Sequence, residues 1–310
     1  MNQTYENGTY TAEREFFGEQ DLSLKNCSFD EGESPFKETR GIKLDSCRFT
    51  SRYPLWYAKS ITAIGCDFTI DSRAGTWYSE DISMENCVFE APKCFRKSKR
   101  IRLTGVKFKD CPETLWECDN IVLTNVTAKG EYFFKGSNNA VIENLTLNGK
   151  YSFDGCRNIT IRNSYLKSKD FIWNCENITL ENCEIDGEYI GWNSKNVRLT
   201  NCRVKSLQGF CYIDNLVLEN CSLAGTSLAF EYSTVDAVVS DEIDSVINPS
   251  GGRIVAKQID KLILDPTKVD PSKTIITAAI GERLEHFDGI IPAIPEAALE
   301  AAKAKENKNY

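Results

Sequence analysis

A six-residue block that recurs every 19 to 21 residues is the feature that most constrains the fold of this chain. It reads LKNCSF from Leu24, MENCVF from Met84, IENLTL from Ile142 and LENCSL from Leu218. The fourth position of the block falls at Cys27, Cys47, Cys66, Cys87, Val106, Val126, Leu145, Ser164, Cys183, Cys202, Cys221 and Asp241. Repeats of such regularity indicate a solenoid, in which each repeat packs on its neighbours.

A repeat of 19 or 20 residues has room for about three short strands with tight turns, but not for a strand and a full helix. The sequence therefore predicts an all-β fold: a single-stranded, right-handed parallel β-helix of about 11–12 rungs over residues 1–250. Residues 251–310 are expected to form cap strands, a short helix and a disordered end. A leucine-rich repeat is the rival interpretation, because Leu216, Leu218, Cys221 and Leu223 match its core pattern.

The 13 cysteines fall mostly in columns that this register directs into the core. Parallel Cβ vectors on successive rungs disfavour disulfides, so we expect reduced thiols that act as small apolar residues. No CxxC pair occurs, and no metal site or cofactor is predicted. A second column, which holds asparagine every 19 residues from Asn120 to Asn215, is expected to stack at turns in the left-handed conformation.

One column mixes tryptophan with charged residues and is the candidate ligand-binding site. It consists of Trp56, Trp77, Arg96, Trp116, Lys135, Asp154, Trp173 and Trp192, which include all 5 tryptophans of the chain. The core would not accept Arg, Lys and Asp without partners, so the column is predicted to face outward, with its tryptophans at least partly exposed. Packing of the aromatic side chains against one another is the alternative interpretation.

Charge and motifs restrict the function. A net charge of −8 disfavours nucleic acid and anionic membrane as partners, and no apolar run is long enough to span a membrane. The N-terminus has no signal-peptide pattern, which predicts a cytoplasmic protein. The basic cluster between Lys93 and Arg102 is expected to be a solvated face paired with acidic residues on adjacent rungs, and a site for an anionic ligand such as a uronate or phosphate is the alternative.

Enzymatic activity has little support in the sequence. The chain has 1 histidine, His286, and no triad, zinc-protease or P-loop motif. Paired carboxylates are enough for glycoside hydrolysis, which leaves Asp154, Asp170, Glu117 and Asp186 as weak catalytic candidates near the tryptophan column.

The segments RYPLWYAKS, GEYFFKGSNNAVIENLTLNGKYSFDG and GEYIGWNSKNVRLTNC resemble those of a bacterial family known as domain of unknown function 3737. The similarity covers nearly all of residues 1–265 and implies a right-handed parallel β-helix and a bacterial origin. It implies no catalytic residue.

Taken together, these patterns favour a non-catalytic binding or scaffold module that recognises a glycan or a protein partner along the aromatic-lined face. A carbohydrate-active enzyme, either a lyase or a hydrolase, is the alternative. A homo-oligomer built through the same tryptophans is a third interpretation.

Overall fold

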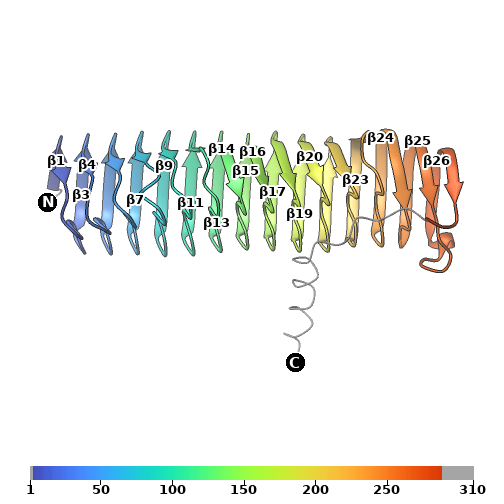
Figure 1. The fold of residues 1–310 in the computed structure, drawn as a ribbon, viewed down its shortest axis with the longest axis horizontal. Coiled ribbons are helices and arrows are strands. Elements are labelled where there is room, and N and C mark those ends of the chain that lie inside the picture. The colour runs from blue at the N-terminus through green and yellow to red at the C-terminus, as the bar shows by residue number, and fades with distance from the viewer. Residues whose placement is uncertain (1–2, 288–310) are drawn as a thin grey trace, which may run out of the picture.

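The computed structural model describes residues 3–287 as one continuous parallel β-solenoid (Figure 1). Each rung contributes one strand to a long sheet, here called sheet A. Its strands, fifteen in the described residues, are β1 (Gln3–Glu6), β3 (Gln20–Lys25), β5 (Arg40–Asp45), β7 (Lys59–Ile64), β9 (Glu80–Glu85), β11 (Lys99–Thr104), β13 (Asp119–Thr124), β15 (Asn138–Glu143), β17 (Arg157–Arg162), β19 (Glu176–Glu181), β21 (Lys195–Thr200), β23 (Asp214–Leu223), β24 (Thr234–Ile247), β25 (Gly251–Ile263) and β26 (Thr274–Leu284). At about 4.8 Å between strands the stack is about 70 Å long.

A second sheet, sheet B, follows sheet A around the corner of each rung. Its strands are β2 (Thr9–Tyr10), β4 (Ser28–Phe29), β6 (Arg48–Phe49), β8 (Asp67–Phe68), β10 (Val88–Phe89), β12 (Lys107–Phe108), β14 (Thr127–Glu131), β16 (Thr146–Lys150), β18 (Tyr165–Lys169), β20 (Glu184–Glu188) and β22 (Arg203–Leu207). All pairings are parallel and join residues of successive rungs, such as Ile159 with Ile178. The third side of the rung consists mainly of turns.

The predicted parallel β-solenoid is confirmed, and it is longer than the repeat indicated. Sheet A has fifteen strands in the described part of the chain, against the 11–12 rungs expected. The extra strands, among them β1, β25 and β26, lack the cysteine-containing block but keep the parallel pairing. Most rungs contribute a strand to each of two parallel sheets, and residues 3–287 contain no α-helix, which differs from the strand-and-helix rung of a leucine-rich repeat.

The predicted domain division at residue 250 stays a prediction, although β25 continues sheet A in register with β24. The expected Ala-rich helix and disordered end, from Ile291 onward, lie outside the described residues. The one helical segment within them is a 3₁₀ turn at Pro271–Lys273.

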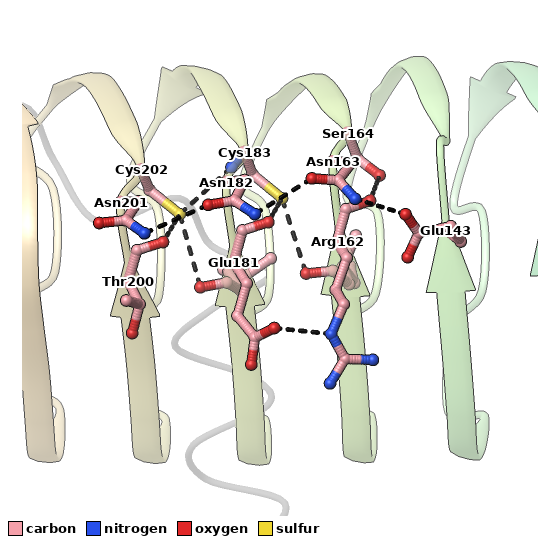
Figure 2. Close-up of polar contacts among 12 residues, drawn as sticks. Glu143, Arg162, Asn163, Ser164, Glu181, Asn182, Cys183, Thr200, Asn201 and Cys202 are labelled. Carbon is pink, nitrogen blue, oxygen red and sulfur yellow. Dashed lines mark hydrogen bonds and ion pairs between the residues drawn. The ribbon is translucent and has the colours of Figure 1, made fainter.

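The cysteine columns have the structural role expected of them, and a further asparagine column, which contains Asn163, Asn182 and Asn201, lies beside one of them (Figure 2). All 13 cysteines are free and buried. Cys202 Sγ donates to the carbonyl of Leu180, 3.5 Å away. Asn201 Nδ2 donates to Asn182 Oδ1 at 3.3 Å, and Asn182 Nδ2 donates to Asn163 Oδ1 at 3.1 Å. Thiol columns therefore tie the core to the backbone, and amide columns close the outer corner.

The predicted asparagine column also adopts the expected geometry. Asn158, Asn177, Asn196 and Asn215 have φ between 53° and 65°, and each donates a 2.9 Å hydrogen bond to the asparagine one rung earlier. Asparagine tolerates this left-handed region better than most residues, which accounts for its recurrence at the corner.

One member of the core column departs from the prediction. Asp241 is half-buried and accepts hydrogen bonds from the Ser222 hydroxyl and, at 3.0 Å, from the Leu223 N–H. Its carboxylate thus satisfies donors near the place where the rung pattern becomes irregular, between β23 and β24.

Candidate functional site

The structure brings all eight residues of the predicted tryptophan column onto the turn side of the solenoid, one per rung. We call this set the aromatic row: Trp56, Trp77, Arg96, Trp116, Lys135, Asp154, Trp173 and Trp192. Isolated parallel bridges join Trp77 to Arg96 and Arg96 to Trp116. The residues just before the row, such as Leu55, Phe95 and Leu115, are fully buried, so the row lies on the outside of the turn.

Arg96 lies between two tryptophans. Its guanidinium carbon is 4.6 Å from the ring centre of Trp77 and 4.5 Å from that of Trp116. An ion pair with Glu113 at 3.0 Å orients the same group. Guanidinium groups stack well on indole faces, so the arginine continues the stack of rings instead of interrupting it.

The stack extends in both directions from Arg96. Trp56 stacks on Trp77 with ring centres 5.4 Å apart and an angle of 11°. Beyond Trp116, Lys135 Nζ lies 5.8 Å from the ring centre and forms a 3.1 Å ion pair with Asp154. Neighbouring residues therefore occupy the ring faces on both sides of Trp77 and Trp116, and the row presents mainly ring edges outward.

The indole N–H groups hold successive rungs together. Each donates to a backbone carbonyl oxygen: Trp56 to Ala74 at 2.6 Å, Trp77 to Lys93 at 2.7 Å, Trp116 to Tyr132 at 2.6 Å and Trp173 to Tyr189 at 2.5 Å. The acceptor in each case lies on the next rung. The tryptophans thus have a structural role in addition to any binding role.

Exposure along the row changes between its two halves. Trp56, Trp77 and Trp116 are half-buried, as expected from the sequence, whereas Trp173 and Trp192 are buried. These two pack with the buried Cys211, which occupies the next rung, and with Tyr189. The expected exposure therefore applies only to the N-terminal half of the row, because large neighbours cover the C-terminal half.

A second column of rings stands directly beside the N-terminal half of the row. Tyr57 and Tyr78 stack with ring centres 4.9 Å apart and an angle of 9°. Tyr57 is 44% exposed. The repeat pattern did not predict this pair, although both tyrosines directly follow a tryptophan of the row. We call the N-terminal half of the row together with Tyr57 and Tyr78 the aromatic face.

Two of the catalytic candidates are engaged in ion pairs on this side. Asp154 pairs with Lys135 and accepts a 2.9 Å hydrogen bond from Asn174. Glu117 pairs with Lys97 at 3.4 Å and is largely exposed. Each of these two carboxylates is therefore engaged by a neighbouring lysine.

The other two candidates lie elsewhere. Asp186 is on β20, on the outer face of sheet B. Asp170, in the turn that follows β18, is 5% exposed, and its Oδ1 has no hydrogen-bond partner in the described structure. Burial raises the pKa of Asp170 to about 6, while Lys150 and Lys169 oppose the shift.

The basic cluster is a solvated, charge-paired surface, as expected. Arg100 pairs with Asp81 and Glu80, at 2.5 and 2.6 Å, and Lys93 pairs with Glu113 at 3.5 Å. Such exposed pairs on neighbouring rungs favour the rung register but contribute little stability.

The described residues contain no group of three or more His, Cys, Asp and Glu side chains that would hold a metal ion. His286 lies at the end of the described segment and contacts Asp265 at 3.3 Å. Residues 3–287 also contain no helix long and apolar enough to cross a membrane.

Fold and side chains together define a parallel β-solenoid protein with a stacked row of tryptophan and arginine on its turn side. The chain belongs to the family described as protein of unknown function (DUF3737), whose model matches residues 3–277. This match confirms the resemblance that the rung motifs indicated.

Comparison with solved structures finds similar chains whose sequence identity to this protein is low. HetL, a pentapeptide repeat protein involved in heterocyst differentiation regulation in the cyanobacterium Nostoc, is 11% identical over 69% of this chain and 84% of its own, with a TM-score of 0.30. PfbA, a surface adhesin of Streptococcus pneumoniae, is 9% identical over 87% of this chain and 85% of its own, with a TM-score of 0.29. No curated protein matches the chain.

Proposed function

We propose that this protein is a non-catalytic binding module that recognises a protein partner along the aromatic face. The observation that carries the proposal is the half-exposed stack of Trp56, Trp77 and Arg96, with Tyr57 and Tyr78 beside it. Trp, Tyr and Arg are the residues most enriched at the energetic centres of protein interfaces.

Preorganisation supports the same proposal. Stacking fixes the rings, and indole hydrogen bonds to Ala74 and Lys93 fix the orientation of Trp56 and Trp77. Side chains that are already ordered lose little conformational entropy when a partner binds. The parallel sheets give the face a rigid base, so it suits a partner of fixed shape.

A glycan is the weaker candidate for this face. Sugars pack their apolar C–H groups on the faces of aromatic rings, and here Trp56, Arg96 and Lys135 already occupy the faces of Trp77 and Trp116. Ring edges, guanidinium groups and tyrosine hydroxyls remain outward, and these suit the mixed polar and apolar surface of a protein.

A carbohydrate-active enzyme is also less well supported. The carboxylates of Asp154 and Glu117 each form an ion pair with a lysine, so they do not form the unengaged carboxylate pair that such an enzyme uses. The thirteen free buried thiols support the cytoplasmic location inferred from the sequence, because such thiols persist in a reducing compartment.

Site-specific photo-crosslinking in the native host tests the partner. A photoreactive phenylalanine analogue replaces Tyr57 in the full chain, and a matched control places it at Tyr165 on sheet B, where exposure is similar at 41% against 44%. We expect a discrete adduct with a second protein from position 57 that is absent from position 165.

Binding measurements with that purified protein complete the test. Tyr57→Ala and Tyr78→Ala are expected to weaken binding at least about tenfold each, the scale of an interface hot spot, while Tyr165→Ala leaves it unchanged. The same adducts from both positions, or none from position 57, would overturn the proposal. An adduct between two copies of this chain would replace it with self-association.

A further inference from the structure

A polar hollow lies on the outer face of sheet B, where the strands β16, β18 and β20 are neighbours. It has a volume of about 450 Å³ and is lined by Asn148, Lys150, Lys167, Lys169, Asp186 and Glu188, with two glycines at its base. Neither the aromatic face nor its proposed partner involves these residues.

The glycines allow the rungs to approach closely here. A Cβ atom added at Gly187 would lie 2.1 Å from the carbonyl oxygen of Ser168, and one at Gly149 would lie 2.5 Å from that of Gly130. Any larger residue would push the strands apart. The hollow is thus a part of the surface where long polar side chains surround bare backbone.

Two charged groups in the hollow have no ion-pair partner within the described residues. Lys167 and Asp186 are in register on neighbouring strands, and Asn148 is in register with Lys167 on the other side. In contrast, Lys169 pairs with Glu188 at 2.7 Å, and Lys150 lies over the ring of Tyr151 at 4.7 Å. One cation, one carboxylate and one amide therefore remain available to a ligand.

An exposed aromatic ring, that of Tyr165, lies two residues before Lys167 on β18, just outside the residues that line the hollow. The alternating burial of the strand places both side chains on its outer face. Tyr165 is 41% exposed. Its in-register neighbours are Thr146 and Glu184, neither of which is aromatic.

From this arrangement we propose that the hollow binds an acidic saccharide, a sugar or short oligosaccharide that carries a carboxylate. Lys167 binds the carboxylate through a charge-assisted hydrogen bond, and Asp186 and Asn148 accept and donate hydrogen bonds with the ring hydroxyls. The apolar C–H face of the sugar packs on Tyr165. The volume is in the range of small-molecule sites.

A simple anion or a neutral sugar would each fit Lys167, Asp186 and Asn148 less well than an acidic saccharide. A simple anion would engage Lys167 but would offer no hydrogen-bond donor to the carboxylate of Asp186. A neutral sugar would leave Lys167 without a partner. A ligand with one carboxylate and several hydroxyls satisfies both groups together with Asn148.

Isothermal titration of the full chain with trigalacturonate as the probe tests the proposal. The neutral galactose trisaccharide and inorganic phosphate serve as comparison ligands. We expect saturable binding of trigalacturonate, at least about tenfold weaker binding of the neutral trisaccharide, and no competition by phosphate at equal concentration. Lys167→Met should weaken binding at least about tenfold, and Tyr165→Ala about fivefold.

Two variants give the matched controls. Tyr57→Ala removes an equally exposed tyrosine from the other side of the solenoid and should leave binding unchanged, as should Lys129→Met, on the same sheet but outside the hollow. Thermal unfolding confirms that each variant keeps the wild-type fold.

Three outcomes would contradict the proposal. If trigalacturonate shows no saturable binding, the proposed site is wrong. If the neutral trisaccharide binds equally well, the ligand is not an acidic saccharide. If phosphate competes fully, the hollow is a simple anion site and the proposal of a saccharide ligand is wrong.

Discussion

The guanidinium of Arg96 lies 4.5 Å from the ring centre of Trp116 and, on its other side, 4.6 Å from that of Trp77. A charged residue thereby becomes part of an aromatic stack that spans successive rungs. This arrangement explains how one column of the repeat can contain both tryptophan and arginine, and it leads to the first prediction.

Arg96→Met is expected to lower the free energy of unfolding by about 1–2 kcal/mol, because two cation–π contacts and the Glu113 ion pair are lost. Urea denaturation measures the change. Arg100→Met is the matched control: its ion pairs with Asp81 and Glu80 are exposed, so the denaturation midpoint should hardly move. Equal effects of the two substitutions would show that the stack of Arg96 between the two tryptophans does not contribute to stability.

Trp173→Phe should destabilise the protein more than Trp116→Phe. Both substitutions remove an indole hydrogen bond to a carbonyl of the next rung. Trp173 is buried, so the Tyr189 carbonyl loses its donor where water has little access, and we expect the free energy of unfolding to fall by about 2–3 kcal/mol. Water can replace the indole at the half-exposed Trp116, where we expect about 1 kcal/mol. Thermal unfolding compares the two, and the reverse order would contradict this account.

Cys175 should tolerate serine better than alanine. Its thiol donates to the carbonyl of Phe153 at 2.8 Å, and the same column contains Ser137 and Ser194, whose hydroxyls make equivalent bonds. Cys175→Ser is expected to stay within about 1 kcal/mol of the wild type, whereas Cys175→Ala leaves a buried carbonyl unpaired and costs about 1–2 kcal/mol. Chemical denaturation of both variants under reducing conditions is the measurement.

Asp170→Asn should stabilise the protein at neutral pH. Burial raises the pKa of Asp170 from its ordinary value to about 6, so the folded state binds the proton more tightly than the unfolded chain. The stabilisation is present below the ordinary value near pH 4 and is lost as the pH rises through about 6. At pH 7.5 the variant should therefore be more stable by about 1–3 kcal/mol.

The control for Asp170 is Asp154→Asn. It removes an ion pair with Lys135 and a hydrogen bond from Asn174, so it should not stabilise the protein at pH 7.5. Denaturation at pH 4.5 and 7.5 separates the two variants. A gain for Asp170→Asn that is as large at pH 4.5 as at 7.5 would show that titration is not its cause.

The sequence by itself determined which residues share a column. Because the backbone of a solenoid repeats with its rungs, a period of 19 to 21 residues places Cys183 on Cys202, and Trp56 in line with Trp77, without any tertiary information. It also predicted the parallel strands and the left-handed asparagines of the corner. It missed the outermost rungs, since β1 and β26 keep the pairing without the block.

Only the tertiary structure decided what each column does. Arg96 occupies the faces of Trp77 and Trp116, and Trp173 and Trp192 are buried, because rotamers and the bulk of neighbours on adjacent rungs govern contact and exposure. Within residues 3–287, Lys167 forms no ion pair although Asp186 is in register beside it, and this too depends on side-chain geometry. Periodicity assigns residues to a side of the solenoid, whereas the packing between rungs decides which of their surfaces a partner can reach.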